Sequence, residues 1–333
     1  MGVHRSRSRM IFKALLVLSG MLLVSFLWLS IPPNPGSLVS NPRPATSYED
    51  SLQRIHALQA EEGSEYNPVC RLKFMDHGQR TERAIVFIHG YTNCPEQFRQ
   101  LGELFFERGY NVLITPQPYM GLADRLNNKH ERLTAEQLVT YTDQVIDIAQ
   151  GLGEHVSLAG LSGGGVLASW AAQQRSDLDL AVVIAPSFGY TFLPGFLTTP
   201  ISNLVRRLPN FYQWWDPIHK LDIDPYYGYP RFSSRALAEI LRLALVVHAE
   251  ACREAPLAGT ILVITNNADL SVVNGRTGQV VDCWRQQGFR SIRSYQFDAS
   301  LGLEHDLIDP SQSHQRTDIV YPQLVDLIID IAH

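Results

Sequence analysis

Short apolar runs alternate with helix-like segments along most of this chain, and no other feature limits its fold as strongly. Apolar residues recur at helical spacing between the runs, as at Phe98, Leu101 and Phe105. Because strands that alternate with helices form a parallel sheet covered on both faces, this order predicts an α/β fold. The runs that we expect to form strands cover residues 84–88, 110–114, 155–159, 178–185, 260–264 and 291–297.

The segment from Pro186 to Pro256 interrupts this alternation. Aromatic residues are far denser within it than the 10% found over the whole chain. An inserted subdomain with its own small core would explain them. A lid that lines an apolar binding cleft would explain them as well, because ligand pockets favour aromatic walls. The two explanations are compatible, and we expect a lid insertion at about residues 186–256.

The N-terminal part of the chain is apolar in a different way. An uncharged stretch of 18 residues runs from Ala14 to Ile31, at the lower limit for a helix that spans a bilayer. A core helix would have a polar face, and a cleaved signal peptide would have a better small-residue cleavage site. We therefore expect residues 1–31 to be a basic cytoplasmic flank and an uncleaved transmembrane signal anchor. The flank contains Arg5, Arg7 and Arg9.

The expected anchor implies a topology and an order of segments. Basic flanks stay cytoplasmic, so the rest of the chain is expected on the far side of the membrane, or secreted if the leader is cleaved. Residues 32–45 are rich in proline and predict an extended tether. The remaining residues, 46–333, suit one large domain with an insertion.

Charge and cysteine spacing limit the classes of partner. The net charge of −5 and the lack of a basic run in the main body argue against nucleic acid. The spacing of cysteine and histidine predicts no metal site. Two disulfides or free buried thiols are both compatible with an even set of cysteines, and the sequence does not decide the pairing. The cysteines are Cys70, Cys94, Cys252 and Cys283.

The stretch Gly160-Leu161-Ser162-Gly163-Gly164 places one serine among glycines, between an apolar run and a run of good helix formers. It matches G-x-S-x-G, in which a sharp strand-to-helix turn exposes a serine hydroxyl. The start of the helix would direct N–H groups towards a developing oxyanion. A phosphate-binding turn or close packing alone would also use glycines, but G-x-G-x-x-G is not met here.

A serine hydroxyl is a weak nucleophile until a base accepts its proton, so Ser162 needs a histidine and a carboxylate. Asp269 and His305 lie in the loops that follow the last two expected strands. Both loops would open at the carboxyl ends of strands, where such partners are expected. The alternatives that remain are Asp298 and Asp306 for the acid and His314 for the base.

Backbone groups near the first strong strand complete the candidate site. His89-Gly90 directly follow the run at 84–88, so the chain can turn sharply beneath Ser162. The N–H of Tyr91 would then pair with that of Gly163 to form an oxyanion hole. His89 precedes the serine in the chain, and we interpret it as structural.

With these pieces assembled, the chain resembles the α/β-hydrolase family. The resemblance covers roughly residues 84–333 and looks closest to the serine esterase, lipase and monoacylglycerol-lipase-like branch, which carries a lid between strands six and seven. The matching motifs are HGYT at 89–92, GLSGG at 160–164, NNADLSVV at 266–273 and LEHDL at 303–307.

The resemblance implies Ser162 as nucleophile, His305 as general base and acid, and Asp269 as the residue that orients His305. It also implies that no cofactor is needed. One departure is plain: many members carry a G-x-G-x-S loop after the second strand, where this chain has PQPYMGLADRLNNKHERL. The wall of the cleft and the acyl preference are therefore left open.

A serine at this turn favours acyl transfer through an acyl-enzyme. We expect a membrane-anchored carboxylesterase or lipase-like hydrolase that acts on a small-molecule or lipid ester with an apolar acyl chain. An acyltransferase, a serine aminopeptidase-like peptidase and a non-catalytic binding domain remain alternatives. A peptidase would present acidic groups to a substrate ammonium, and the insertion offers Asp216, Asp222, Asp224, Glu239 and Glu250.

Overall fold

A seven-stranded sheet forms the centre of the computed structural model, which describes residues 2–332 and the side chains of residues 10, 12, 13 and 15–331. The strands lie in the order β1-β3-β2-β4-β5-β8-β9, with β1 antiparallel to β3 and all other pairs parallel. Each expected apolar run contributes one strand, which confirms the α/β fold. The bounds are β1 Lys73–Met75, β2 Thr81–Ile88, β3 Asn111–Ile114, β4 Gly153–Leu161, β5 Leu180–Ile184, β8 Thr260–Asn266 and β9 Ile292–Phe297.

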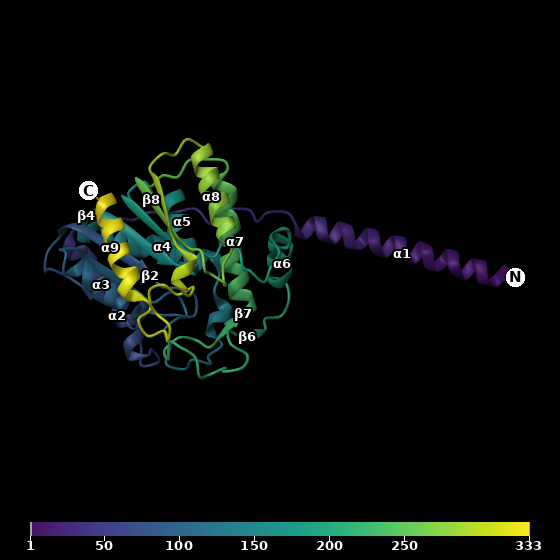
Figure 1. Ribbon diagram of the computed structural model, residues 1–333, viewed down its shortest axis with the longest axis horizontal. Coiled ribbons are helices and arrows are strands. Elements are labelled where there is room, and N and C mark those ends of the chain that lie inside the picture. The colour runs from purple at the N-terminus through teal and green to yellow at the C-terminus, as the bar shows by residue number, and fades with distance from the viewer. Residues whose placement is uncertain (1, 333) are drawn as a thin grey trace.

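Helices cover both faces of this sheet (Figure 1). On one face, Phe105 of α3 and Ile328 of α9 share a buried cluster with Phe87 of β2. On the other face, α2, α4, α5, α7 and α8 contribute to a second cluster. Burial on both faces explains why the central strands are continuous apolar runs. The helices are α2 Tyr48–Glu61, α3 Arg99–Phe106, α4 Ala135–Leu152, α5 Gly163–Gln174, α7 Ser234–Ala251, α8 Asn274–Gln286 and α9 Thr317–Ala332; short 3-10 helices cover Pro68–Cys70, Pro95–Phe98, Lys129–Arg132, Gly195–Leu197 and Ala299–Leu301.

Local signals in the sequence define some helix ends and miss others. Thr134 and Gln137 form a capping box at the start of α4, as a threonine followed three residues later by a glutamine favours. The helix α2 was not predicted, because Ser51 and Ile55 are its buried residues and leave little apolar periodicity. Tertiary contact stabilises α2: Ser51 donates a hydrogen bond to the carbonyl of Ile148 on α4 over 2.6 Å.

The N-terminal segment corrects one prediction. The helix α1, Gly2–Leu29, projects away from the body (Figure 1). Its part from Ala14 onwards measures roughly 24 Å at the rise of an α-helix, less than the roughly 30 Å of a bilayer core. Among the residues that the structure describes, no helix has both the length and the apolar character needed to cross a membrane. The prediction of a transmembrane anchor is therefore wrong. The basic residues Arg5, Arg7 and Arg9 lie outside the described side chains.

The proline-rich residues between α1 and α2 run along the surface of the domain. Leu38 is fully buried, and its carbonyl accepts a hydrogen bond from Trp170 Nε1 on α5 over 2.7 Å. The backbone N–H of Arg43 donates to Asp147 on α4 over 2.8 Å. These contacts attach the segment to two helices of the sheet's outer layer.

A buried ion cluster joins the same two helices. The guanidinium of Arg175, directly after α5, is fully buried and lies 2.9 Å from Asp143, 2.7 Å from Asp147 and 2.8 Å from Asp177. Three carboxylates compensate for the desolvation of one arginine. Removing one partner from such a cluster leaves uncompensated charge in the interior.

Replacing Arg175 with methionine should destabilise the protein by about 3–5 kcal/mol, because the carboxylates of Asp143 and Asp147 stay buried without a cation. Urea unfolding followed by tryptophan fluorescence measures the change. The control is Arg54→Met, which removes a partly exposed ion pair with Asp50 and should cost far less. Equal destabilisation by the two substitutions would contradict the role assigned to the cluster.

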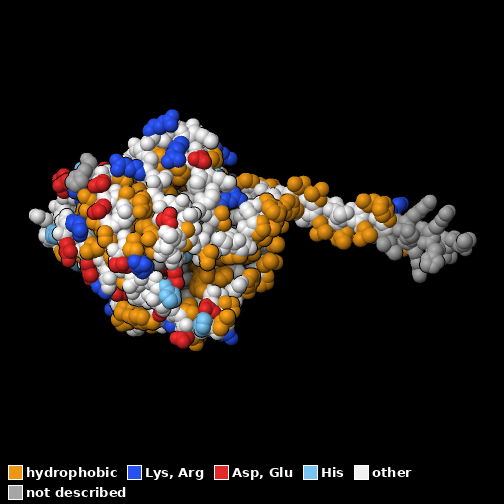
Figure 2. All heavy atoms as spheres, in the orientation of Figure 1, with side chains coloured by type: hydrophobic (Ala, Val, Ile, Leu, Met, Phe, Trp, Pro, Cys, Tyr) orange, Lys and Arg blue, Asp and Glu red, His pale blue; other side chains and the backbone are white. Residues whose placement is uncertain are grey.

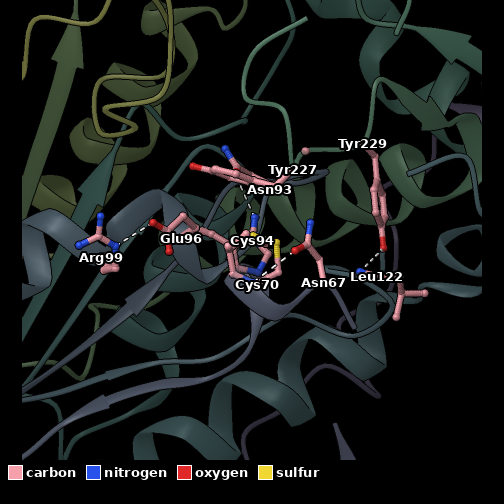
Figure 3. Close-up of a disulfide and its surroundings, with 12 residues drawn as sticks. Asn67, Cys70, Asn93, Cys94, Glu96, Arg99, Leu122, Tyr227 and Tyr229 are labelled. Atoms are coloured by element: carbon pink, nitrogen blue, oxygen red, sulfur yellow. Dashed lines mark hydrogen bonds and ion pairs between the residues drawn. A yellow bond between two sulfur atoms is a disulfide. The ribbon is translucent and has the colours of Figure 1, made fainter. Parts of the chain in front are cut away.

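Two disulfides decide the cysteine pairing that the sequence left open: Cys70 with Cys94, and Cys252 with Cys283. The first is buried and joins the segment before β1 to the loop after β2 (Figure 3). The ring of Tyr227, from the inserted segment, packs against it. This crosslink therefore lies where three parts of the chain meet.

The segment between β5 and β8 forms an insertion above the carboxyl edge of the sheet. It contains α6 Thr198–Val205, the antiparallel pair β6 Tyr212–Trp214 and β7 Arg231–Ser233, and α7. Hydrophobic side chains gather over the insertion where the projecting helix α1 meets the domain and contacts α6 (Figure 2). The helix α7 packs against α5, so one part of the insertion is fixed to the domain. That the insertion acts as a lid stays a prediction.

Candidate active site

Ser162 lies at a strained turn between β4 and α5. Its φ of 57° and ψ of −112° are unusual for a residue with a side chain. The carbonyl of Ile184 accepts its N–H over 2.9 Å, and its own carbonyl accepts the N–H of Val166 over 3.1 Å. The turn therefore holds the serine at the carboxyl end of the sheet and at the N-terminus of a helix.

The glycines around Ser162 are required by close backbone packing. A Cβ on Gly160 would overlap the carbonyl of Gly164, and a Cβ on Gly164 would overlap the carbonyl of Ile88. Both obstacles are backbone atoms, so no side-chain rotation relieves them. Glycine at these two positions lets α5 approach β4 and β2 closely enough to form the turn.

Two loops bring a histidine and a carboxylate to Ser162. His305 follows β9, and its Nε2 lies 2.9 Å from Ser162 Oγ. Asp269 follows β8, and its Oδ2 lies 2.7 Å from His305 Nδ1. The structure thus brings together the three side chains that the sequence singled out.

Asp269 is held as a carboxylate. Its Oδ1 accepts the N–H groups of Ser271 and Val272 over 2.8 and 3.1 Å. Burial opposes its ionisation, but the hydrogen bond and charge of His305, together with the two backbone bonds, hold the pKa of Asp269 below its usual range. An ionised Asp269 keeps the proton of His305 on Nδ1, which leaves Nε2 free to accept one from Ser162.

The backbone N–H groups of Tyr91 and Gly163 lie next to each other beside Ser162. Gly163 is the first residue of α5, so its N–H has no acceptor within that helix. The nitrogen of Tyr91 lies 3.4 Å from the position of a Cβ built on Gly163. Two backbone N–H groups this close to a candidate nucleophile are candidates to bind a developing negative charge.

Backbone strain is concentrated at this edge of the sheet. Thr92, Ser162 and Ala185 follow β2, β4 and β5, and their φ values are 68°, 57° and 39°. Strained residues of this kind cluster at functional sites. The insertion holds Thr92 in place, because its carbonyl accepts the N–H of Tyr229 over 2.7 Å and its Oγ1 accepts Trp215 Nε1 over 2.9 Å.

His89 is buried beneath this loop. Its Nδ1 lies 2.8 Å from the carbonyl of Gly90, and its Nε2 accepts the N–H of Gln117 over 3.0 Å. Burial lowers the pKa of His89 to about 4, so the ring is neutral at physiological pH. With both ring nitrogens engaged, His89 supports the chain turn and is not available as a base.

A cavity of about 520 Å³ opens beside Ser162 and His305. The loops after β2, β4, β8 and β9 form one side of it, and the insertion forms the other. Among its described lining residues there is no lysine or arginine, and the acidic ones are Asp224 and Asp306. Its aromatic lining residues are Tyr91, Tyr190, Phe192, Trp214, Trp215, Tyr229 and Phe232.

Ser187 contacts the candidate nucleophile and was not predicted. It is fully buried, directly after the turn that ends β5, and its Oγ lies 2.9 Å from Ser162 Oγ. Its N–H also donates to the carbonyl of Ser162 over 3.2 Å. A hydroxyl-bearing residue directly after a buried strand is a sequence signal that points to Ser187, since the carboxyl ends of parallel strands meet at one edge of the sheet.

The alternative acids and the alternative base make other contacts than Asp269 and His305 do. Asp298 accepts the N–H of Ser300 over 2.8 Å and caps a short 3-10 helix. Asp306 accepts a hydrogen bond from Gln97. His314 lines a neighbouring hollow that Ser162 does not border.

The acidic residues considered for a peptidase are mostly outside the cavity. Glu239 forms ion pairs with Arg206 and Arg242. Asp224 lines the cavity beside Ser162. The remaining three, Asp216, Asp222 and Glu250, are not among its lining residues.

One group of described residues has the composition of a metal site. A ring nitrogen of His248 and the sulfur atoms of Cys252 and Cys283 lie within 4.8 Å of one another. The two sulfurs are bonded to each other, and the thiolate rather than the disulfide is the metal ligand. This group is therefore a crosslink between α7 and α8.

Comparisons with solved structures point to one fold. The lipolytic enzymes LipS and LipT, derived from a metagenome, match at 16% identity and a TM-score of 0.58, over 80% of this chain and 99% of that chain. Monoacylglycerol lipase of Paleococcus ferrophilus matches at 17% and 0.60, over 78% and 98%. A soluble variant of monoglyceride lipase from Saccharomyces cerevisiae, in complex with a substrate analogue, matches at 11% and 0.59, over 78% and 90%. At these identities the likeness establishes the fold.

Residues 85–305 match the alpha/beta hydrolase family. The chain therefore belongs to the alpha/beta hydrolase family, which confirms the resemblance inferred from its motifs. A search of curated proteins finds no match to the sequence.

Gly160→Ala should unfold the serine turn or abolish its function, because the new methyl group meets the carbonyl of Gly164. We expect a lower melting temperature and loss of labelling of Ser162 by a fluorophosphonate. Gly278→Ala in α8 is the matched control, since a Cβ there meets nothing within 4 Å. That control should change stability by less than about 1 kcal/mol and favour the helix. A Gly160→Ala protein as stable and reactive as the control would refute the packing argument.

Proposed function

We propose that this protein is a serine hydrolase that cleaves carboxylic esters with an apolar acyl chain. The observation that carries the proposal is the contact of Ser162 with His305 and of His305 with Asp269, at 2.9 and 2.7 Å. A hydroxyl, an imidazole and a buried carboxylate in this order are the groups needed for nucleophilic acyl transfer. Membership of the hydrolase family supports the same reaction class.

In the first half of the reaction, Ser162 Oγ attacks the ester carbonyl carbon while His305 Nε2 accepts the hydroxyl proton. The carbonyl oxygen becomes negatively charged and is bound by the N–H groups of Tyr91 and Gly163. The bond to the alcohol then breaks, and His305 returns the proton to the leaving alcohol. In the second half, His305 accepts a proton from the water that attacks the acyl-enzyme and returns it to Ser162 Oγ as the acid is released.

The cavity supports an uncharged, apolar substrate. Aromatic side chains form much of its wall, and no described lysine or arginine lines it, so an anionic group on the acyl chain would find no partner. Solved structures of similar fold include a monoacylglycerol lipase and lipolytic enzymes. A small-molecule or lipid ester is therefore the proposed substrate class.

Hydrolysis of p-nitrophenyl esters with acyl chains of increasing length tests this proposal. We expect turnover by the wild type, with a preference among chain lengths that reflects the depth of the cavity. Ser162→Ala should lose at least 1,000-fold in kcat, on the order expected for a triad serine, and should no longer react with a fluorophosphonate. Unchanged turnover in Ser162→Ala would sink the proposal. Product analysis with added alcohol distinguishes hydrolysis from acyl transfer to an acceptor other than water.

We further propose that the hydrolase domain works outside the cytoplasm. Two disulfides support this, because such crosslinks persist in oxidising compartments and are rare where thiols are kept reduced. Protein taken from its native cells and alkylated before lysis should carry no label on Cys70, Cys94, Cys252 or Cys283 unless reduced first. Full labelling without a reductant would contradict this location.

A further inference from the structure

We propose that Gln97 is a positioning residue that couples the candidate oxyanion hole to the catalytic histidine. This inference rests on the proposed function, because it concerns how that site is held together. Gln97 lies in the short helix after β2 and is 2% exposed. It is not among the residues that the sequence pointed to.

The two ends of one carboxamide contact two different loops. Gln97 Oε1 accepts the N–H of Gly90 over 2.8 Å, directly before Tyr91. Gln97 Nε2 donates to Asp306 Oδ2 over 2.6 Å, directly after His305. The side chain of Gln97 therefore contacts the residue directly before the candidate oxyanion donor Tyr91 and the residue directly after the base His305.

The loops of Tyr91 and His305 follow strands that are not neighbours in the sheet. The loop of Tyr91 follows β2 and the loop of His305 follows β9, and the sheet order places β4, β5 and β8 between these strands. Among the described residues no backbone ladder pairs β2 directly with β9, so contacts above the sheet add to the sheet in fixing the distance between their loops. Gln97 provides such a contact directly.

The carboxylate of Asp306 is held by several hydrogen bonds, so its contact with Gln97 helps to fix the position of the loop that carries His305. Its Oδ1 accepts the N–H groups of Ile308 and Asp309 over 3.2 and 3.1 Å. Its Oδ2 also accepts weaker hydrogen bonds from Asn93 and Gln312, both at 3.3 Å. The side chain therefore caps its own loop while it receives the hydrogen bond from Gln97.

A second bridge runs parallel to the first. Asn93 Nδ2 donates to Asp309 as well as to Asp306, and Asn93 Oδ1 accepts the N–H of Cys94, the disulfide cysteine beside it in Figure 3. Tyr227 donates to Asp309 over 2.6 Å. Burial and the charge of Asp306 raise the pKa of Asp309 to about 6. Asp306 therefore lies in a crowded set of hydrogen bonds, and the shortest that it accepts comes from Gln97.

The chemistry of this link suits an amide. Gln97 accepts from Gly90 and donates to Asp306 at the same time, whereas an ionised carboxylate can only accept. Glutamate keeps the acceptor and the shape but turns a carboxylate towards Asp306. Gln97→Glu should therefore push the two loops apart without creating a cavity.

Misplacement of catalytic groups by about 1 Å costs on the order of 100-fold in rate. We expect Gln97→Glu to lower kcat by about 10- to 100-fold and to change KM less, since Gln97 hydrogen-bonds to the loops of Tyr91 and His305, although it also lines the cavity. Asp306→Asn should lower kcat less. The double variant Gln97→Glu with Asp306→Asn restores a donor opposite an acceptor. Its kcat should be at least tenfold higher than that of the single variant Gln97→Glu.

The experiment measures kcat and KM on the best p-nitrophenyl ester for the wild type, both single variants and the double variant, with melting temperatures for all four. Gln286→Glu, on the exposed face of α8, controls for the added charge and should match the wild type. A wild type without ester turnover overturns the proposed function and this inference with it. An active wild type together with an unaffected Gln97→Glu, an unrescued double variant, or losses that merely follow the folded fraction overturns the inference alone.

Discussion

The close approach of α5 to β4 and β2 is the constraint on which the rest of the site depends. Gly160 and Gly164 allow it, because their missing side chains leave room for backbone carbonyls. The approach forces Ser162 into a positive φ and leaves the N–H of Gly163 unused at the start of a helix. This close approach therefore supplies both a raised hydroxyl and one of the two candidate oxyanion donors.

Around this turn the site is assembled from loops that the sheet keeps at one edge. His305 and Asp269 arrive from β9 and β8, and Tyr91 arrives from β2. The insertion does more than cover the cavity, since Tyr229 and Trp215 hydrogen-bond to Thr92 beside Tyr91. A movement of these two residues would therefore disturb the loop of Tyr91, which contains one of the two candidate oxyanion donors.

The outer layer shows the same dependence on long-range contact. Arg175 compensates for carboxylates on α4, and the proline-rich segment before α2 is attached to α4 and α5 by Asp147 and Trp170. The two disulfides join segments that are separated by 24 and 31 residues. Each of these contacts pairs groups whose partner cannot be inferred from neighbours along the chain.

The sequence by itself determined the alternation of strands and helices, the serine turn, and the places of Asp269 and His305 after strands, because periodicity and position after a strand are local properties. It led to the wrong conclusion for the apolar N-terminus, where composition suggested a membrane span that no described helix provides. Only the tertiary structure decided the disulfide pairing and the contacts of Ser187 and Gln97. Position after a buried strand brings Ser187 to the right edge of the sheet and no comparable pattern marks Gln97, but the contacts of both depend on distances between loops that only the fold sets.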